Sequence, residues 1–422
     1  MSSSVAPFLL NGAVPVFKFG RQFVLWLHDR FITTPTDPRN DPELANLTLD
    51  SALFVDEKKQ CPVLTFFPSS WCNLGCSYCY SGKKEKINLN FDAAKIAIDH
   101  LSKRGEAGDC TIGVVFHGGG EPTQNFELVK AVVTYLTEQN ISHTRAIVTN
   151  GTASTEQYKW LLDHEFTVGV SIDGPPPIQD KQRPSRDGTP SSNRIETAIG
   201  RQRDHKNFGN VNVRVTLTRE SVVHVTRILQ YLRSLGITNV FLETMEDNGF
   251  TRTNEFRFKK PTTSQMISAT RRAHRFAARH NMRIGRGRFM SSAPRTTGCI
   301  AITGRSFVIT PKNTISACYE CTSDTGTLGD IFNIGYIDTR QGTLVLHEEK
   351  VDRLRQRNVY NLPSCTECFA KFICAGGCAV RGIRETKDFW GVFEDECVLI
   401  RRTVEQLIEL LWTQSANSAH AT

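Results

Sequence analysis

Three cysteines, Cys72, Cys76 and Cys79, lie within one short stretch, spaced C-x3-C-x2-C, directly after the strand-like run 63–67. Three thiolates on one loop can hold three irons of a cubane [4Fe–4S] cluster. The next cysteine, Cys110, lies thirty-one residues beyond Cys79. A zinc ion would need four ligands, typically supplied in C-x2-4-C pairs. The spacing therefore favours a cluster with one iron left open for a ligand that is not protein.

A glycine-rich turn follows the next strand-like run, 111–116. It contains Gly118, Gly119, Gly120 and Glu121. Adjacent glycines let the backbone approach a ligand closely, and they expose N–H and C=O groups. Alone, such a turn is commonly just a tight loop, but behind a cysteine triad it indicates a ligand site.

Polar side chains also stand along the later strand-like runs. Asn150, Thr152, Ser171 and Asp173 lie where two of these runs end, Arg183 lies in the segment after 166–171, and Arg214 lies within 212–217. In parallel α/β barrels, catalytic groups sit at the C-terminal ends of the strands. We therefore expect these side chains to share one pocket with the cysteines. An arginine inside a strand of a closed sheet is costly unless it is paired, so Arg214 is expected to have a partner.

Alternating strand-like and helical segments predict the fold that positions these residues. The strand-like runs are 63–67, 111–116, 145–149, 166–171, 212–217 and 240–243. The helical stretches are 92–104, 125–139, 154–164, 192–204, 220–235 and 263–280. This alternation implies a parallel sheet with right-handed crossovers. We predict an α/β fold, a partial (β/α)6 TIM-like barrel followed by a small cysteine-rich iron–sulfur domain.

The predicted domains are an N-terminal extension, the barrel, the cysteine-rich domain, and a C-terminal helix with its tail. Their boundaries are 1–60, 61–290, 291–400 and 401–422. In the extension, runs 14–19 and 21–27 predict a hairpin around Gly20, and 33–46 predicts a loop. We interpret the extension as a barrel cover, with substrate or leader-peptide contact as the alternative.

The chain has 422 residues and thirteen cysteines, and its apolar runs, such as 112–116, fall short of a membrane span. Its N-terminus lacks the regions of a signal peptide, so we expect a cytoplasmic protein without a membrane partner. In a reducing compartment, many cysteines indicate metal rather than disulfides. Only Cys61 and Cys110 stand apart from the cysteine clusters, and we interpret them as buried structural thiols.

The formal net charge is +8, and it would fall to about +3 if eleven cysteines bound three clusters. The basic stretch 271–280, continuing to Arg283, Arg286 and Arg288, could bind RNA or an acidic leader peptide. A solvated outer face of the barrel is the commoner outcome, and we do not expect a nucleic-acid partner.

The cysteine triad and the Gly-Gly-Glu-Pro element about forty residues later resemble the radical S-adenosylmethionine (SAM) superfamily. The resemblance implies that the amino and carboxylate groups of SAM chelate the open iron of the [4Fe–4S] cluster. An electron then cleaves SAM to methionine and a 5′-deoxyadenosyl radical. The resemblance also implies that the glycine turn with Glu121 binds the SAM amino group and that Tyr78 contacts adenine.

Other polar residues gain candidate roles from the same resemblance. The candidates for the ribose hydroxyls and the methionine carboxylate are Asn150, Thr152, Ser171 and Asp173. Arg183 matches a recurring Asp-x-x-Arg element, and Arg214 could pair with a carboxylate of SAM or of the substrate.

The downstream cysteines resemble the SPASM domain, the cluster-carrying extension of radical SAM enzymes that modify peptides and proteins. The resemblance implies one auxiliary cluster on Cys365, Cys368, Cys374 and Cys397. It implies another on Cys299, Cys318 and Cys378, with Cys321 as the candidate fourth ligand. A zinc-ribbon appendage is the alternative that the C-x2-C pair alone would permit, and the number of matched cysteines disfavours it.

Two residues depart from the family pattern. Asn313 stands where the family has a glycine, and asparagine tolerates the left-handed conformation. Sulfatase-maturing members place an aspartate directly after the cysteine matching Cys318, as proton acceptor, whereas this chain has Tyr319 and then Glu320. A tyrosine with a pKa near 10 is a poor base at neutral pH, which leaves Glu320 as the stand-in and weakens the sulfatase-maturase interpretation.

The resemblance implies an enzyme that abstracts a hydrogen from a ribosomally made precursor peptide and forms a carbon–carbon, carbon–oxygen or thioether crosslink. Its partners would be that peptide and an external reductant such as flavodoxin or ferredoxin. The auxiliary clusters would take the electron. The alternatives are an anaerobic sulfatase maturase, a small-molecule radical SAM dehydrogenase, a peptide epimerase and, from another class, a non-catalytic iron–sulfur electron carrier.

Overall fold

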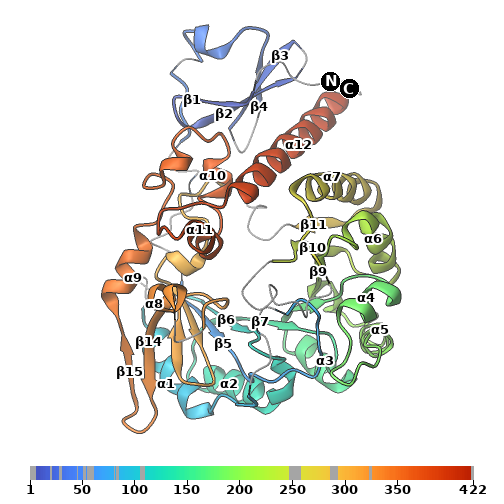
Figure 1. The fold of residues 1–422 in the computed structure, drawn as a ribbon, viewed down its shortest axis with the longest axis vertical. Coiled ribbons are helices and arrows are strands. Elements are labelled where there is room, and N and C mark those ends of the chain that lie inside the picture. The colour runs from blue at the N-terminus through green and yellow to red at the C-terminus, as the bar shows by residue number, and fades with distance from the viewer. Residues whose placement is uncertain are drawn as a thin grey trace. The chain divides into compact units, whose positions relative to one another are not determined.

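The computed structural model describes residues 6–19, 21–27, 31–44, 46–50, 54, 61–79, 81, 85–104, 110–246, 258–285, 293–322 and 326–419. The chain forms two compact units (Figure 1). The barrel unit comprises Lys58–Gly287 and Ala301–Leu354. The cysteine-rich unit comprises Met1–Glu57, Arg288–Ile300 and Arg355–Thr422.

The barrel unit is built on one large sheet with the strand order β11-β10-β9-β8-β7-β6-β5-β12-β13-β14-β15. The strands from β11 to β12 in this order are parallel to their neighbours. They are β5 (Val63–Phe66), β6 (Ile112–Phe116), β7 (His143–Thr149), β8 (Thr167–Ser171), β9 (Val211–Leu217), β10 (Asn239–Thr244), β11 (Arg283–Gly285) and β12 (Ser306–Ile309). The prediction of an α/β fold with a partial TIM-like barrel is confirmed.

Helices cover the outer face of this sheet, as Figure 1 shows. They are α1 (Phe91–Leu101), α2 (Phe126–Glu138), α3 (Thr155–Asp163), α5 (Ser192–Gly200), α6 (Val225–Ser234) and α7 (Thr263–His280). Local sequence fixes their starts: Ser154 and Gln157 form a capping box before α3, and Thr262 and Gln265 form one before α7. A short helix, α4 (Pro176–Gln182), and strand β11 were not predicted.

Side chains alternate between two environments along the barrel strands. In β9, Val211, Val213, Val215 and Leu217 are buried, whereas the residues between them are half-buried. Because successive side chains of a strand point to opposite faces, one face of the sheet packs against the helices. The other face carries the polar residues of the barrel interior.

Residues 301–354 extend the barrel sheet. Strand β12 pairs with β5 in parallel, and an antiparallel meander of β13 (Thr314–Ser316), β14 (Asn333–Asp338) and β15 (Thr343–Leu346) follows. Helices α8 (Thr327–Phe332) and α9 (Glu348–Arg355) complete this part. Asn313 has φ of 61° in the turn before β13, which confirms that asparagine adopts the left-handed conformation there.

Cys61 and Cys110 form a disulfide in the barrel unit. The prediction of two buried thiols was therefore wrong, and both residues are only half-buried. Cys61 precedes β5 and Cys110 precedes β6, and these strands are neighbours in the sheet. Parallel pairing brings the starts of the two strands together, which places the two sulfurs within bonding reach.

The cysteine-rich unit contains a four-stranded antiparallel sheet in the order β1-β2-β3-β4. Its strands are β1 (Phe8–Leu10), β2 (Val14–Phe19), β3 (Gln22–Trp26) and β4 (Phe31–Thr34). The predicted hairpin is confirmed as β2 paired with β3, although Gly20 lies outside the described residues. Strand β4 ends within the stretch 33–46 that was predicted to be a loop, so the first two residues of that stretch are extended.

The unit also contains helices α10 (Lys371–Cys374), α11 (Ala379–Thr386) and α12 (Glu394–Ala419). One hydrophobic core joins Phe17 of β2 to Cys374 and to Ile400 and Val404 of α12. Phe17 packs edge-on against Phe369, with ring centroids 5.6 Å apart. The N-terminal sheet therefore shares its core with the cysteine segment. Across the described residues, no helix of either unit is long and apolar enough to cross a bilayer.

Candidate functional site

The loop that carries Cys72, Cys76 and Cys79 is held by backbone hydrogen bonds on both sides. Its Trp71 carbonyl accepts a hydrogen bond from the N–H of Glu121 at 2.8 Å. On the other side, Gly75 N–H donates to the carbonyl of Pro184 at 2.8 Å. The loop is thus fixed between the glycine turn after β6 and the segment that follows α4.

The three thiols of this loop interact electrostatically with one another. Burial raises the pKa of Cys72 to about 11 and that of Cys76 to about 12. Repulsion from the neighbouring thiolates, including Cys79, adds to both increases. Three half-buried thiols close enough to interact are a donor set that suits an iron–sulfur cluster, whose positive core would stabilise the thiolates. The site fits the implied cluster.

The glycine turn packs directly on the cysteine loop. A Cβ atom on Gly120 would lie 2.1 Å from the carbonyl oxygen of Trp71, and one on Gly118 would lie 2.0 Å from the carbonyl oxygen of Gly120. A side chain on Gly120 would push the turn away from the loop, and one on Gly118 would clash with the backbone of the turn itself. Gly120 therefore permits the close contact between turn and loop, and Gly118 permits the fold of the turn.

Glu121, which was predicted to face SAM, is buried with 1% of its surface exposed. Its Oε1 accepts hydrogen bonds from the N–H and hydroxyl of Thr123 and from the Thr149 hydroxyl, at 3.1, 2.7 and 2.7 Å. Its Oε2 accepts from the N–H of Asn150 at 2.7 Å. The carboxylate thus ties the glycine turn to the end of β7.

Asn150 connects β7 to the cysteine loop. Its Nδ2 donates to Asn73 Oδ1 at 2.8 Å and lies 3.5 Å from Cys72 Sγ. Its Oδ1 accepts from the hydroxyl of Thr152 at 2.7 Å, and Thr152 Oγ1 accepts from Asn73 Nδ2 at 2.8 Å. The structure therefore brings two predicted site residues, Asn150 and Thr152, to Cys72.

Asp173 and Arg183 form a buried ion pair behind Tyr78. The distance from Arg183 Nε to Asp173 Oδ2 is 3.0 Å, with side-chain exposures of 10% and 0%. The Tyr78 hydroxyl donates to the same carboxylate oxygen, and Arg183 Nη1 lies 3.9 Å from Cys76 Sγ. Gln182 Nε2 also donates to Oδ2, at 2.7 Å. These contacts anchor the middle of the cysteine loop to the end of β8.

Arg214 lies on the interior face of β9 beside Ser171, its register partner on β8. Arg214 has a partner, as predicted, but this partner belongs to the protein: Glu243 of β10, with 3.2 Å between Nη2 and Oε1. Both side chains are partly exposed, at 35% and 25%. The barrel interior thus presents a charged pair that remains accessible. Pairing with a carboxylate of SAM or of the substrate stays a prediction.

His117 follows β6 and was not among the predicted site residues. Its ring stacks on that of Tyr319, with centroids 4.7 Å apart. Burial and the positive charge of Arg214 lower the pKa of His117 to about 4. His117 and Glu243 could have been identified from the sequence by their place, since each occupies an inward position at the end of a barrel strand.

The cysteine-rich unit brings together the four cysteines that were predicted to share one auxiliary cluster. Burial raises the pKa of Cys374, and the charges of Cys397, Cys365 and Cys368 add to the rise. Burial is also the main cause of the raised pKa of Cys397, to which the charges of Cys365 and Cys368 contribute. Among the described residues, no three His, Cys, Asp or Glu side chains converge on one metal-ion position. The ligands of a cluster bind separate irons, and they do not need to converge in this way.

The other predicted auxiliary set is divided between the units. Cys299 and Cys378 belong to the cysteine-rich unit, and Cys318 and Cys321 belong to the barrel unit. In the barrel unit, hydrogen bonding to Cys321 raises the pKa of Cys318, as does burial. The two barrel-unit cysteines are thus neighbours. The assignment of the four cysteines to one cluster stays a prediction.

Arg357 is a buried residue that sequence reasoning missed. It is 1% exposed, and its guanidinium donates to the carbonyl oxygens of Phe389 and Gly391. Burial lowers its pKa, whereas the nearby charges of Cys365 and Cys378 raise it. A buried cation beside thiolates stabilises their charged form.

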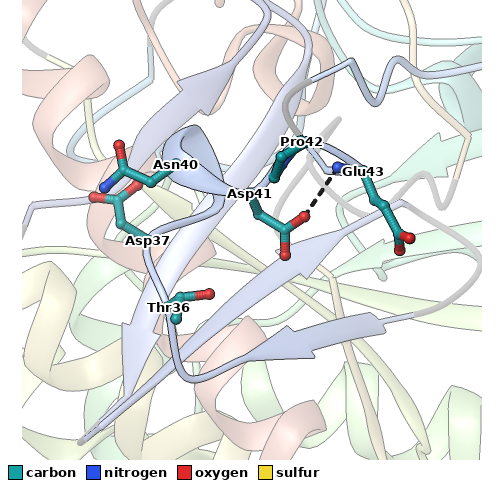
Figure 2. A pocket seen from close by; sticks show the side chains of 6 residues that line it. All are labelled: Thr36, Asp37, Asn40, Asp41, Pro42 and Glu43. Atoms are coloured by element: carbon teal, nitrogen blue, oxygen red, sulfur yellow. Dashed lines mark hydrogen bonds between the residues drawn. The ribbon is translucent and has the colours of Figure 1, made fainter.

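A hollow near the N-terminal sheet is lined by Thr36, Asp37, Asn40, Asp41, Pro42 and Glu43 (Figure 2). Its carboxylates serve local turns: Asp37 pairs with Arg39 at 2.6 Å, and Asp41 accepts from the N–H of Glu43 at 3.0 Å. We assign this hollow no part in the site around the cysteine loop.

Comparison with known proteins agrees with this geometry. Residues 66–232 match the sequence profile described as the Radical SAM superfamily. The chain is 22% identical over 325 residues to the serine-type anaerobic sulfatase-maturating enzyme of Klebsiella aerogenes. This alignment covers 73% of this chain and 76% of that protein. It is 30% identical over 178 residues to an uncharacterised protein of Methanocaldococcus jannaschii, covering 42% of this chain but only 59% of that protein.

Solved structures share the fold. The structure of anSMEcpe with bound AdoMet and Cp18Cys peptide has a TM-score of 0.64 at 18% identity, covering 84% of this chain and 99% of that one. Streptococcus suis SuiB bound to precursor peptide SuiA has a TM-score of 0.54 at 14% identity, covering 78% and 74%. At these identities, the likeness concerns the fold alone.

Proposed function

We propose that this protein is a radical SAM enzyme, on the match of residues 66–232 to that superfamily, and that it modifies a precursor peptide by hydrogen abstraction and leaves an oxidative crosslink between two residues. The bond formed would be carbon–carbon, carbon–oxygen or thioether. We place this activity in the cytoplasm, with an acidic one-electron carrier of the flavodoxin or ferredoxin class as reductant.

The proximity of Cys365, Cys368, Cys374 and Cys397, whose charges interact within the cysteine-rich unit, carries the proposal. Crosslinking removes a hydrogen atom, a proton and an electron from the peptide. When bound, SAM and its cluster supply the group that takes the hydrogen atom, and an auxiliary cluster accepts the electron. A chain with a second set of thiols therefore suits a net oxidation better than a redox-neutral reaction.

One set of residues would contact SAM, and another would position the site. The proposed SAM contacts are the backbone of Gly118, Gly119 and Gly120 and the side chains of Tyr78, Ser171 and Arg214. Because the carboxylates of Glu121 and Asp173 already accept several hydrogen bonds from the chain, we propose that these two residues act by positioning. Each ties one side of the cysteine loop to a barrel strand.

Tyr319 and His117 would line the substrate side of the barrel interior. Their rings stack on each other, and the Arg214–Glu243 pair offers one cationic and one anionic group to a peptide backbone. Preorganised polar groups in a partly dry interior orient a substrate at low entropic cost.

A sulfatase maturase is the second candidate, because similarity to the Klebsiella aerogenes maturase extends over 73% of this chain. In that case, Glu320 would accept the proton that an aspartate takes in sulfatase-maturing members of the family. Tyr319, which occupies the aspartate position, is half-buried and stacked on His117. Its role as a proton acceptor is opposed by the ordinary pKa of a phenol.

The test begins with anaerobic reconstitution, dithionite and SAM, followed by measurement of 5′-deoxyadenosine. Absence of this product would refute the radical mechanism. Next, the enzyme is co-expressed with precursor peptides encoded beside it, and the products are analysed by mass spectrometry. Loss of the mass of a hydrogen pair, with fragmentation blocked between two residues, is the expected result. Loss of a hydrogen pair from a single serine of a sulfatase peptide, giving an aldehyde, would favour the maturase. So would conversion of a single cysteine to the same aldehyde, in which water then replaces the sulfur by oxygen and H2S leaves. Epimerisation would leave the mass unchanged.

A further inference from the structure

Positive charge is concentrated in one segment of the chain. Residues 256–319 contain thirteen Lys or Arg residues and no Asp or Glu. Because the whole chain has a net charge of +8 and this segment contributes +13, the remaining residues have a net charge of −5. The excess positive charge of the protein therefore belongs to this one stretch.

Helix α7 places three arginines of this segment in solvent. Arg271, Arg275 and Arg279 are exposed, whereas Ala273 and Ala277 on the opposite side of the helix are buried. The three arginines recur every four residues, so they form a row along one face. Arg272 is different, since its guanidinium donates to the carbonyl oxygens of Val222 and Val223. Arg272 thus helps to hold α7 against the segment before α6, whereas the three arginines of the row extend into solvent.

The neighbouring helix α6 also carries exposed arginines. Arg227 and Arg233 are exposed, and residues 221–242 contain no Asp or Glu. We call the row Arg271, Arg275 and Arg279 on α7 the arginine face. Within the part of the chain that the structure describes, none of these five arginines makes an ion pair. Other exposed cations do, as in the pairs Lys130–Glu127 and Arg402–Glu405.

We propose that the arginine face binds an acidic, extended segment of the peptide substrate, outside the residues that are modified. The inference rests on the proposed peptide-modifying function. Four residues of a helix rise about 6 Å, and side chains on one side of an extended peptide repeat about every 6.7 Å. Carboxylates at alternate positions of the peptide would therefore meet Arg271, Arg275 and Arg279 in turn, and guanidinium groups bind carboxylates with two hydrogen bonds.

The side chains around the arginine face favour a peptide over a nucleic acid. Single-stranded nucleic acids bind through exposed aromatic rings on which bases stack. The aromatic residues of the two helices, Tyr231 and Phe276, are half-buried. Tyr231 donates its hydroxyl hydrogen to Glu196 at 2.5 Å, and the Phe276 ring lies 4.2 Å from that of His280. The face is rich in cations and lacks an exposed stacking platform.

Fluorescence anisotropy with a defined probe tests the proposal. The probe is a fluorescein-labelled peptide of about twelve residues with alternating Glu and Thr, added to the full-length reconstituted enzyme. The variant R271Q/R275Q/R279Q should bind it about tenfold more weakly. The control R194Q/K206Q/R340Q removes three exposed cations elsewhere on the barrel unit and should bind as the wild type does. The lysine variant R271K/R275K/R279K should retain most of the affinity.

Equal weakening by both glutamine variants would overturn the proposal, since it would show only a general charge effect. Displacement of the probe by flavodoxin or by a DNA oligonucleotide at lower concentrations than by unlabelled peptide would also overturn it. Formation of 5′-deoxyadenosine without peptide is measured on the same samples and should be unchanged in both variants. Because probe binding requires no radical chemistry, an inactive wild type that binds the probe would refute the proposed function and leave the binding face intact.

Discussion

The ring of Tyr319 stacks on the imidazole of His117, with the centroids 4.7 Å apart and the planes inclined by 30°. Phe67 stacks with the same imidazole at 6.1 Å. The backbone N of Gly118 lies 2.8 Å from His117 Nδ1. Burial and the positive charge of the nearby Arg214 lower the pKa of His117 and so favour the neutral imidazole. The protein therefore holds an uncharged histidine at the end of β6.

This arrangement makes stability depend on pH. Because the pKa of His117 is about 4 in the folded chain and 6.5 in the reference state, the unfolded chain binds more protons between these values. Stability should consequently fall as the pH decreases from 6.5 towards 4. At pH 5, we expect His117 to cost about 2 kcal/mol relative to pH 8. Urea unfolding of the wild type and His117→Phe at both pH values measures this difference. The phenylalanine variant preserves the stacking and should lose less stability, and identical losses would contradict the prediction.

Replacement of Glu121 should weaken both the fold and the cluster site. In Glu121→Gln, the amide NH2 would face the N–H of Asn150 or the donors of Thr123 and Thr149, where the carboxylate accepts hydrogen bonds. A lost buried acceptor costs about 1–3 kcal/mol. Because Asn150 contacts Cys72, we also expect formation of 5′-deoxyadenosine to fall at least about tenfold.

Glu127→Gln is the matched control for this variant. Glu127 is 85% exposed and pairs only with Lys130 on the surface of α2, so its replacement should change stability by less than about 0.5 kcal/mol. If Glu121→Gln retained wild-type stability and wild-type yield of 5′-deoxyadenosine, the positioning role of the carboxylate would be wrong.

Asp173→Asn should be more severe, because it leaves a buried arginine without its counterion. The Asp173 side chain is fully buried, and Arg183 is 10% exposed. Removal of one partner of a buried ion pair typically costs about 3–5 kcal/mol. Arg183 lies beside Cys76, so iron content after reconstitution should also fall. Calorimetry and iron analysis of this variant are compared with those of Asp204→Asn, an exposed carboxylate on the same unit. Similar behaviour of the two variants would contradict the proposed anchoring.

The sequence predicted the elements that have strong periodicity. The helix predicted at 263–280 is observed as α7 (Thr263–His280), with a capping box at its start. The six strand-like runs correspond to β5 to β10 within two residues at each end. Alternation of buried and half-buried residues, as in β9, also placed Arg214 in the interior. Local sequence patterns and the topology of a parallel barrel were therefore enough to predict the barrel strands and helices and the clustering of the polar residues at one end of the sheet.

Three features could not be predicted, because each depends on contacts between distant residues. Nothing near Glu121 in the sequence shows that Thr149 and Asn150 would satisfy its carboxylate. The pairing of β12 with β5 joins residues more than two hundred positions apart, so residues 301–354 were assigned to the other domain. The stacking of Tyr319 on His117 follows from that pairing rather than from either residue's neighbours.

The disulfide between Cys61 and Cys110 provides a further prediction. It joins the starts of β5 and β6, and it closes a loop with a sequence separation of 49 residues. Constraining a loop of this size in the unfolded chain stabilises the folded one by about 2–4 kcal/mol. Cys61→Ser should therefore lower the unfolding free energy by that amount in oxidising buffer, and it should match the wild type once both are reduced. Thiol titration of the cluster-free wild type in denaturant should give eleven free thiols. A titre equal to all thirteen cysteines in oxidising buffer would show that the bond does not form, and the buried-thiol interpretation would then return.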